Sequence, residues 1–167
     1  MTILDICEWL ETTAIAVLIQ ESAYGFPILV GIHILGISLS AGTLLWADLR
    51  LLGASLRGYQ LAEVYRGLAP WFLTGFGVMI ISGAVLFTAF ATSAYGNVYF
   101  RIKTVAIVLA GVNALIFHMA ARREANRSAP ATATPMIARI SGLTSIALWA
   151  VVIVAGRMMS YTMFSSP

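Results

Sequence analysis

The sequence has few charged residues and almost no cysteine, and each shortage excludes a class of protein. Only 10% of its 167 residues are charged and 60% are hydrophobic, whereas an average soluble domain has about 25% charged residues. The single cysteine, Cys7, excludes a disulfide within the chain and a metal site built from several cysteines. The net charge of +3 comes mostly from arginines between apolar runs, which is typical of a topology signal. The composition therefore indicates an integral membrane protein without a nucleic-acid partner.

Four apolar runs are long enough to cross a bilayer, which requires about 20 residues of helix. The predicted fold is an all-α integral membrane protein, a four-transmembrane-helix bundle. It is expected to form one domain over residues 1–167, with spans at approximately 26–47, 70–94, 99–121 and 140–164.

An additional short segment precedes the first span. In residues 1–22, Ile3, Cys7 and Leu10 recur with helical spacing, and Trp9 is a residue type that favours the membrane interface. We expect this segment to form an amphipathic interfacial helix that lies on the bilayer surface.

Positive charge is divided unevenly between the two sides of the predicted bundle. The loops after the first and third spans, with their flanks, hold seven arginines: Arg50, Arg57, Arg66, Arg122, Arg123, Arg127 and Arg139. The other side has Arg101 and Lys103 together with four acidic residues near the N-terminus. The positive-inside rule predicts a multi-pass protein of the bacterial inner (cytoplasmic) membrane with both termini in the periplasm.

Ionisable residues inside the spans are the candidates for function, because they are costly in a bilayer and usually face the interior of a bundle. They are His33 in the first span, Lys103 and His118 in the third, and Arg157 in the fourth. Histidines on the first and third spans suggest a haem b between diagonal helices, with His33 and His118 as metal ligands.

The helix face that carries His33 has small residues on it. Gly36, Ile37, Ser40 and Leu44 share this face by helical counting, so a shallow groove runs beside the imidazole. The groove suits either a flat cofactor or the close approach of another helix. The second span has a small-residue face of its own, which favours helix contact and consists of Gly75, Met79, Ser82 and Gly83.

Depth within the membrane separates the two histidines. At about 1.5 Å per residue, His33 lies about 10 Å from the outer end of its span and His118 about 27 Å from the outer end of its own, a mismatch of roughly 16 Å. The same count places Lys103 and Arg157 near the level of His33. One imidazole with two cations suits an anionic ligand: haem propionates, a quinone or quinol head group, or a carboxylate metabolite. The cofactor-binding set therefore comprises His33, His118, Lys103 and Arg157, with His118 as a second ligand or as part of a separate site.

Most of these residues also have a purely structural interpretation. Lys103 can extend to the outer interface, His118 can be an interfacial histidine, and His33 can donate to a backbone carbonyl in the core. At the end of the first span, Asp48 and Arg50 are expected to pair with each other. Arg157, by contrast, is hard to explain without a partner.

Two segments, HILGISLSAGTLLWADLRLL and RIKTVAIVLAGVNALIFHMAARR, carry a resemblance to known families. The first has a histidine followed by Arg50, and the second opens with a lysine and closes with a histidine. This layout resembles the HemJ-type protoporphyrinogen oxidases and, more distantly, the membrane domains of CopD copper-resistance proteins. The whole chain is also similar to an uncharacterised bacterial family of four-helix membrane proteins, with DLRLLG after the first span and GRMMSY in the fourth.

The resemblance to HemJ implies a b-type haem, a role for His33 and a functional lysine at Lys103. The resemblance to CopD implies copper handling. The expected function is a b-type haem-binding membrane protein in electron transfer or redox chemistry. The alternatives are a copper-handling protein of CopD type and a non-catalytic subunit of a larger membrane complex. The expected surroundings are a lipid bilayer, with a quinone or another membrane redox partner and a homo-oligomer or larger complex left open.

Overall fold

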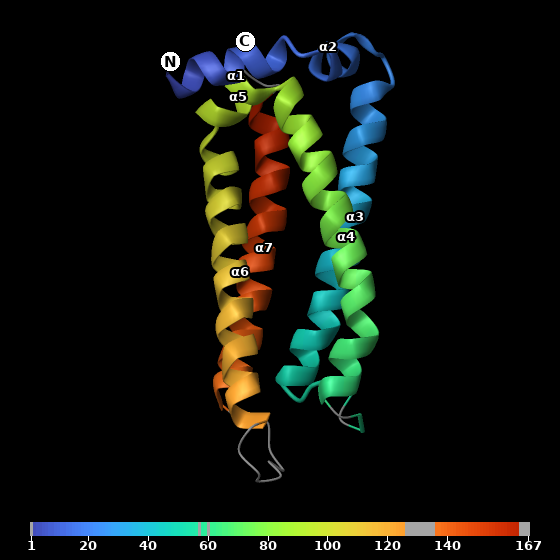
Figure 1. Ribbon diagram of the computed structural model, residues 1–167, viewed down its shortest axis with the longest axis vertical. Coiled ribbons are helices and arrows are strands. Elements are labelled where there is room, and N and C mark those ends of the chain that lie inside the picture. The colour runs from blue at the N-terminus through green and yellow to red at the C-terminus, as the bar shows by residue number, and fades with distance from the viewer. Residues whose placement is uncertain (1, 57, 60, 126–135, 164–167) are drawn as a thin grey trace.

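Four long helices make up the body of the protein, in a computed structural model that describes residues 2–56, 58–59, 61–125 and 136–163. For residues 61–62, 117–118 and 120–125 it describes the backbone alone. The long helices are α3 (Gly25–Leu51), α4 (Leu61–Ala89), α6 (Val98–Ala125) and α7 (Met136–Met163), shown in Figure 1. Three short helices complete the described chain: α1 (Ile3–Glu11), α2 (Ala14–Glu21) and α5 (Ala91–Gly96).

Each long helix contains a stretch that is long and apolar enough to cross a membrane. The candidate spans are Gly25–Leu51, Glu63–Ala89, Val98–Ile116 and Met136–Met163, with mean hydropathy between 1.5 and 2.0. The predicted all-α fold, with four membrane-spanning helices preceded by short N-terminal helices, is confirmed. The chain is a multi-pass membrane protein.

The second long helix differs most from the expected boundaries. α4 begins at Leu61, so Pro70 lies inside the helix rather than at its start. An internal proline removes one backbone hydrogen bond of the helix. The turns before it include Val64, which is only 8% exposed and is therefore packed against the rest of the protein. At the other end the helix stops before Phe90, whose φ of −140° is not helical, and α5 begins as a separate turn. The expected span of 70–94 is therefore two helices that meet at a bend.

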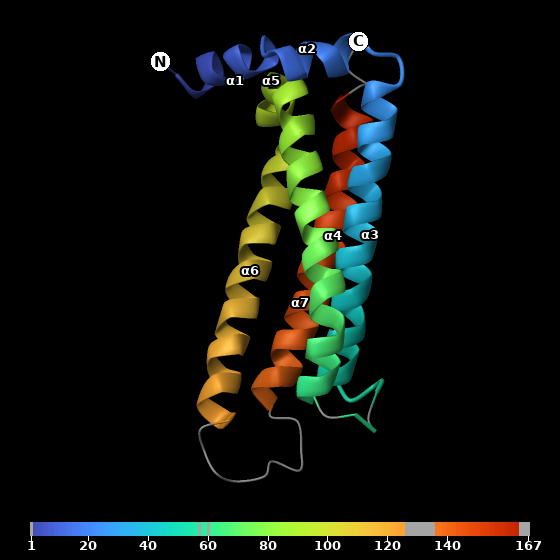
Figure 2. The ribbon, with the colours of Figure 1, turned by 45° about the vertical axis from the view of Figure 1, so that its right-hand side comes forward.

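The bundle is built from two helical hairpins. α3 packs along α4, and α6 packs along α7, while contact between the hairpins runs chiefly through α3 and α7. Figure 1 shows the two pairs next to each other, and Figure 2 shows α7 passing behind α3 and α4. The start of α1 and the end of α7 lie at the same end of the bundle (Figure 1), as four consecutive spans require.

Glycines allow α3 and α4 to cross closely. A Cβ atom on Gly36 would lie 2.8 Å from the backbone nitrogen of Met79, and one on Gly75 would lie 2.6 Å from the backbone nitrogen of Ser40. Ser40 is fully buried at this crossing. The groove beside His33 is thus occupied by a neighbouring helix, which is the helix-packing alternative predicted from the sequence.

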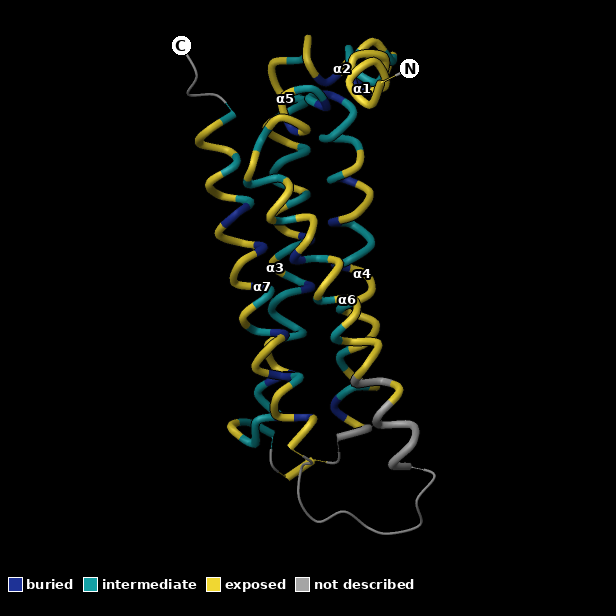
Figure 3. The backbone as a smooth tube through the Cα atoms, turned by 90° about the vertical axis from the view of Figure 1, so that its left-hand side faces the viewer, coloured by how far each residue is buried: buried dark blue, intermediate teal, exposed yellow. Residues whose placement is uncertain are grey.

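Burial is confined to the inward-facing side of each helix. The core contains Met79, Ala106, Trp149 and Val152. Along the backbone of each long helix, buried and intermediate positions alternate with exposed ones (Figure 3). Many of these exposed side chains are large and apolar, for example Ile81 at 68% exposed. A surface of this kind is suited to lipid.

The N-terminal helices lie across the end of the bundle (Figure 1). Thr2 caps α1 through a reciprocal pair of hydrogen bonds with Asp5, and these bonds hold the pKa of the Asp5 carboxyl below its usual value. Gln20 donates to the carbonyl oxygen of Ala89 at 2.6 Å, and a Glu11 carboxyl oxygen accepts from the backbone N–H of Thr92 at 2.8 Å. These side chains tie α1 and α2 to the bend between α4 and α5.

Candidate functional site

A cavity of about 480 Å³ lies between the two hairpins, in the half of the bundle nearer α1 and α2. Its volume is in the range of pockets that hold small ligands, about 300–1,000 Å³. The polar side chains that line it come from three helices: His33 and Ser38 from α3, Lys103 from α6, and Arg157 and Ser160 from α7.

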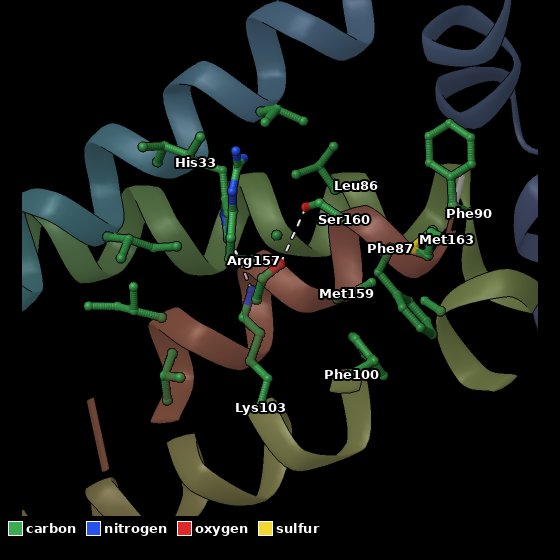
Figure 4. A pocket seen from close by; sticks show the side chains of 18 of the residues that line it. His33, Leu86, Phe87, Phe90, Phe100, Lys103, Arg157, Met159, Ser160 and Met163 are labelled. Atoms are coloured by element: carbon green, nitrogen blue, oxygen red, sulfur yellow. Dashed lines mark hydrogen bonds between the residues drawn. The ribbon is translucent and has the colours of Figure 1, made fainter. Parts of the chain in front are cut away.

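The structure brings together three of the residues that depth counting placed at one level. His33, Lys103 and Arg157 all line this cavity, and the predicted convergence is therefore confirmed. Figure 4 shows Lys103 extending from α6 toward His33 of α3. Binding of a cofactor by these residues stays a prediction.

The His33 imidazole has a hydrogen-bonding neighbour at each nitrogen. Its Nδ1 atom lies 3.0 Å from the Ser82 hydroxyl oxygen, and its Nε2 atom lies 3.3 Å from the Lys103 ammonium nitrogen. A lysine ammonium group only donates, so Nε2 accepts and the ring proton resides on Nδ1. The Nδ1–H group then donates to Ser82, whose own hydroxyl donates to the carbonyl oxygen of Val78 at 2.5 Å.

Gly83 provides the space in which the imidazole lies. A Cβ atom at this position would be 2.9 Å from Cε1 of His33 and 3.4 Å from Nδ1. Any larger residue would push the ring away from α4. Ser82 and Gly83 thus fix the position of His33 from the neighbouring helix, one by a hydrogen bond and the other by its lack of a side chain.

Arg157 lines the cavity but does not contact His33 directly. Its Nη2 group donates to the Tyr161 hydroxyl at 3.0 Å, and its guanidinium group lies 4.8 Å from the centre of the Tyr161 ring. The residue is exposed rather than buried in the bundle. Its partner is therefore an aromatic side chain one turn further along α7.

Aromatic and sulfur-containing side chains form the rest of the wall at the end nearer α5. Phe87 stacks on Phe100 with ring centres 5.4 Å apart, across the gap between α4 and α6. The apolar residues at this end of the cavity, several labelled in Figure 4, are Phe26, Leu86, Phe87, Phe90, Phe100, Met159 and Met163. The cavity therefore has apolar walls and a small polar region around His33.

His118 does not lie at this level. It belongs to α6, and fifteen residues of continuous helix after Lys103 correspond to about 22 Å along the axis. The prediction that its side chain binds a cofactor falls outside the described side chains. The position of its backbone places it toward the opposite end of the bundle from His33.

The expected pair of Asp48 and Arg50 is not formed. Arg50 instead donates through Nε and Nη2 to the carbonyl oxygen of Tyr59, at 3.1 and 2.8 Å. Asp48 is only 5% exposed and is turned toward α7, where Ser145 lies near its carboxyl group. The pair does not form because residues two apart on a helix point in different directions. The partners that the two side chains have instead depend on tertiary contacts.

Two further site residues, Ser82 and Gly83, were read from the sequence only as part of a packing face. Their relation to His33 depends on the register between α3 and α4, which a single sequence does not reveal. Among the described residues, no group of three or more His, Cys, Asp or Glu side chains is placed to hold a metal ion.

These features describe a four-span membrane protein with a ligand-sized cavity centred on a histidine–lysine pair. The chain belongs to DUF6644, a family of unknown function whose model matches residues 6–162. Neither the curated proteins nor the solved structures contain a match to the chain.

Proposed function

We propose that the protein binds a b-type haem in the cavity between the hairpins and acts in electron transfer or redox chemistry. The observation that carries this proposal is the contact between His33 and Lys103. These are the two residues for which the resemblance to HemJ implies a function. They lie on α3 and α6 and are 70 positions apart in the sequence. Residues so distant in sequence meet at a cavity large enough for a ligand.

The donor chemistry of His33 suits an axial ligand. Histidines that bind metals usually donate their second ring N–H to a neighbouring oxygen, which fixes the tautomer and the orientation of the ring. In this protein the Nδ1–H group donates to Ser82, and the lone pair of Nε2 faces Lys103 across the cavity. The neutral imidazole is therefore held in the form that a haem iron requires.

The two cations suit the charges of the same cofactor. Lys103 has a long, flexible side chain, so its ammonium group would be able to hold a propionate of a bound haem. Arg157 at the cavity wall is a second candidate for a propionate. The phenylalanine and methionine side chains offer the apolar surroundings that a porphyrin ring prefers, and Met159 or Met163 would be able to bind the iron together with His33.

A bound haem would supply one-electron chemistry. The contribution of this chain would be to orient the imidazole, neutralise the propionates and exclude water by means of its apolar walls. In this proposal the arginine-bearing loops face the cytoplasm and both termini face the periplasm, while α1 and α2 rest in the outer interface of the bacterial inner membrane. Exposed apolar residues on α1, such as Ile3 and Trp9, support that placement.

The absorption spectrum of the protein tests the proposal. Protein purified from haem-replete cells should show a Soret band, and His33→Ala should abolish it. His118→Ala is the matched control, and it should retain the band because position 118 lies about 22 Å from the level of the cavity. A colourless wild-type preparation, or a band that survives His33→Ala, would contradict the proposal.

The alternatives have weaker support. Copper handling would call for a cluster of soft or nitrogen ligands, and the described residues hold no group of three or more His, Cys, Asp or Glu side chains placed to hold a metal ion. A structural subunit would use its apolar outer surface to contact other subunits of a complex, but contact with lipid explains that surface equally well. Neither alternative has an observation that favours it over haem.

A further inference from the structure

A second cavity, of about 360 Å³, lies between α3 and α7 on the side of the bundle away from α1. It shares Ser38, Ala41 and Ile153 with the cavity that contains His33, so the two adjoin. Its wall is mainly apolar, and among the lining residues the single ionisable group is the carboxyl group of Asp48. Such a cavity requires an explanation separate from the haem site.

Asp48 contributes a buried hydrogen-bond acceptor to this cavity. The residue is 5% exposed, and a carboxyl group placed in apolar surroundings is costly unless donors satisfy its oxygens. Ser145 of α7 and Tyr65 of α4 both lie near enough to the carboxyl group for an electrostatic interaction. The two carboxyl oxygens together have about four acceptor positions, so capacity remains for a donor inside the cavity.

The remaining walls indicate the shape of the ligand. Trp149, itself 8% exposed, presents a broad apolar indole, and Gly42 and Ala150 leave a slot in front of it. Leu45 and Ile153 are 44% and 48% exposed on the outside of the bundle, within the candidate spans. A molecule that enters here comes from the bilayer.

We infer that this second cavity binds the head of a lipid-soluble quinol, with one hydroxyl group donating to Asp48 and the ring against Trp149. The hydroxyl group of a quinol is neutral and needs a single acceptor, while the apolar ring of the quinol stays in the slot. A charged amine would have to lose its hydration within a span, which costs more. The inference goes beyond the haem proposal and does not depend on it, because His33 does not line this cavity.

The test compares two ligands that differ only in their donors. Binding of a tritiated alkyl benzoquinol and of its dimethyl ether to the purified protein is measured by scintillation proximity under reducing conditions. Wild type should prefer the quinol by about five- to tenfold, since a hydrogen bond to a buried carboxyl group is worth roughly that factor. Asp48→Ala should bind both ligands equally.

A second variant blocks the cavity without altering charge. A Cβ atom on Gly42 meets nothing within 4 Å, so Gly42→Leu can place its side chain in the slot without a clash, and it should remove the binding of both ligands. Gly77→Leu is the control, because Gly77 has equally open space but lines neither cavity.

The outcomes separate this inference from the haem proposal. His33→Ala should lose the Soret band and still prefer the quinol. Equal binding of quinol and ether by wild type, a preference that survives Asp48→Ala, or full binding in Gly42→Leu would each overturn the quinol site while leaving the haem spectrum unaffected.

Discussion

At the scale of single residues, the site depends on side chains that hold His33 rather than on His33 alone. The ring is fixed by a donor–acceptor series that runs from Lys103 through His33 and Ser82 to the carbonyl oxygen of Val78. Each contact in the series joins a donor to an acceptor, so a change at one member leaves its neighbour without that partner. Such networks make a ligand histidine selective in tautomer and orientation.

Ser82→Ala should weaken haem binding while leaving the bundle intact. The change removes the acceptor for Nδ1–H, and the loss of such a supporting residue typically lowers metal affinity by about 10–100-fold. Titration of haem into the apoprotein, followed by absorbance, measures the effect.

Thr88→Ala is the matched control for this prediction. Thr88 lies on the same helix and donates only to the carbonyl oxygen of Val85, without contact to the cavity. Its haem affinity should equal that of wild type. Equal affinities for Ser82→Ala and Thr88→Ala would show that Ser82 does not support the ligand.

At the scale of helices, the decisive feature is the crossing of α3 and α4. Gly36 and Gly75 face each other with so little room that either added Cβ would approach backbone atoms of the other helix. Close approach of this kind replaces the hydrophobic effect as the source of helix association in a bilayer. The crossing also sets the register that brings Ser82 and Gly83 to His33.

Gly75→Ala should destabilise the hairpin. Its Cβ would lie 2.6 Å from the backbone nitrogen of Ser40, and backbone cannot move aside as a flexible side chain does. Overpacking of this type costs about 1–3 kcal/mol, so the midpoint of thermal unfolding in detergent should fall.

Gly77→Ala should shift the same midpoint in the opposite direction or not at all. An added Cβ at Gly77 meets open space, and alanine in a helix is favoured over glycine by roughly 0.5–1 kcal/mol. Destabilisation of both variants by the same amount would show that helix propensity, rather than the crossing, determines the effect.

At the scale of the whole molecule, the two hairpins meet along α3 and α7 and leave adjoining cavities between and beside them. The end that carries α1, α2 and α5 also carries the acidic residues Glu8 and Glu11, and the loop after α3 at the opposite end carries arginine. If the arginine-bearing end is cytoplasmic, the His33 cavity lies in the outer half of the membrane. Orientation therefore determines from which side a redox partner of the haem would approach.

Cysteine labelling tests this orientation. In a Cys7→Ser background, Glu8→Cys at an exposed position of α1 should react with a membrane-impermeant maleimide in spheroplasts. Ala54→Cys, exposed after α3, should react only after lysis. The reverse pattern would place the termini in the cytoplasm and the cavity in the inner half of the membrane.

The sequence by itself determined the class of protein, the four spans and the common level of His33, Lys103 and Arg157. Hydropathy and the constant rise of a helix are local quantities, so they can be counted along a chain without knowledge of which helices touch. The boundaries of α4 were less predictable, because the helix continues through Pro70 and the turns before it include the buried Val64.

Only the tertiary structure decided which faces meet. It placed α4 in the groove beside His33, put Ser82 and Gly83 against the imidazole, and directed Asp48 toward α7 instead of Arg50. These contacts depend on the rotation and register of one helix against another. The physical reason is that an apolar helix in a bilayer has no amphipathic stripe to identify its inward side, so small residues and hydrogen bonds select that side only when the partner helix is present.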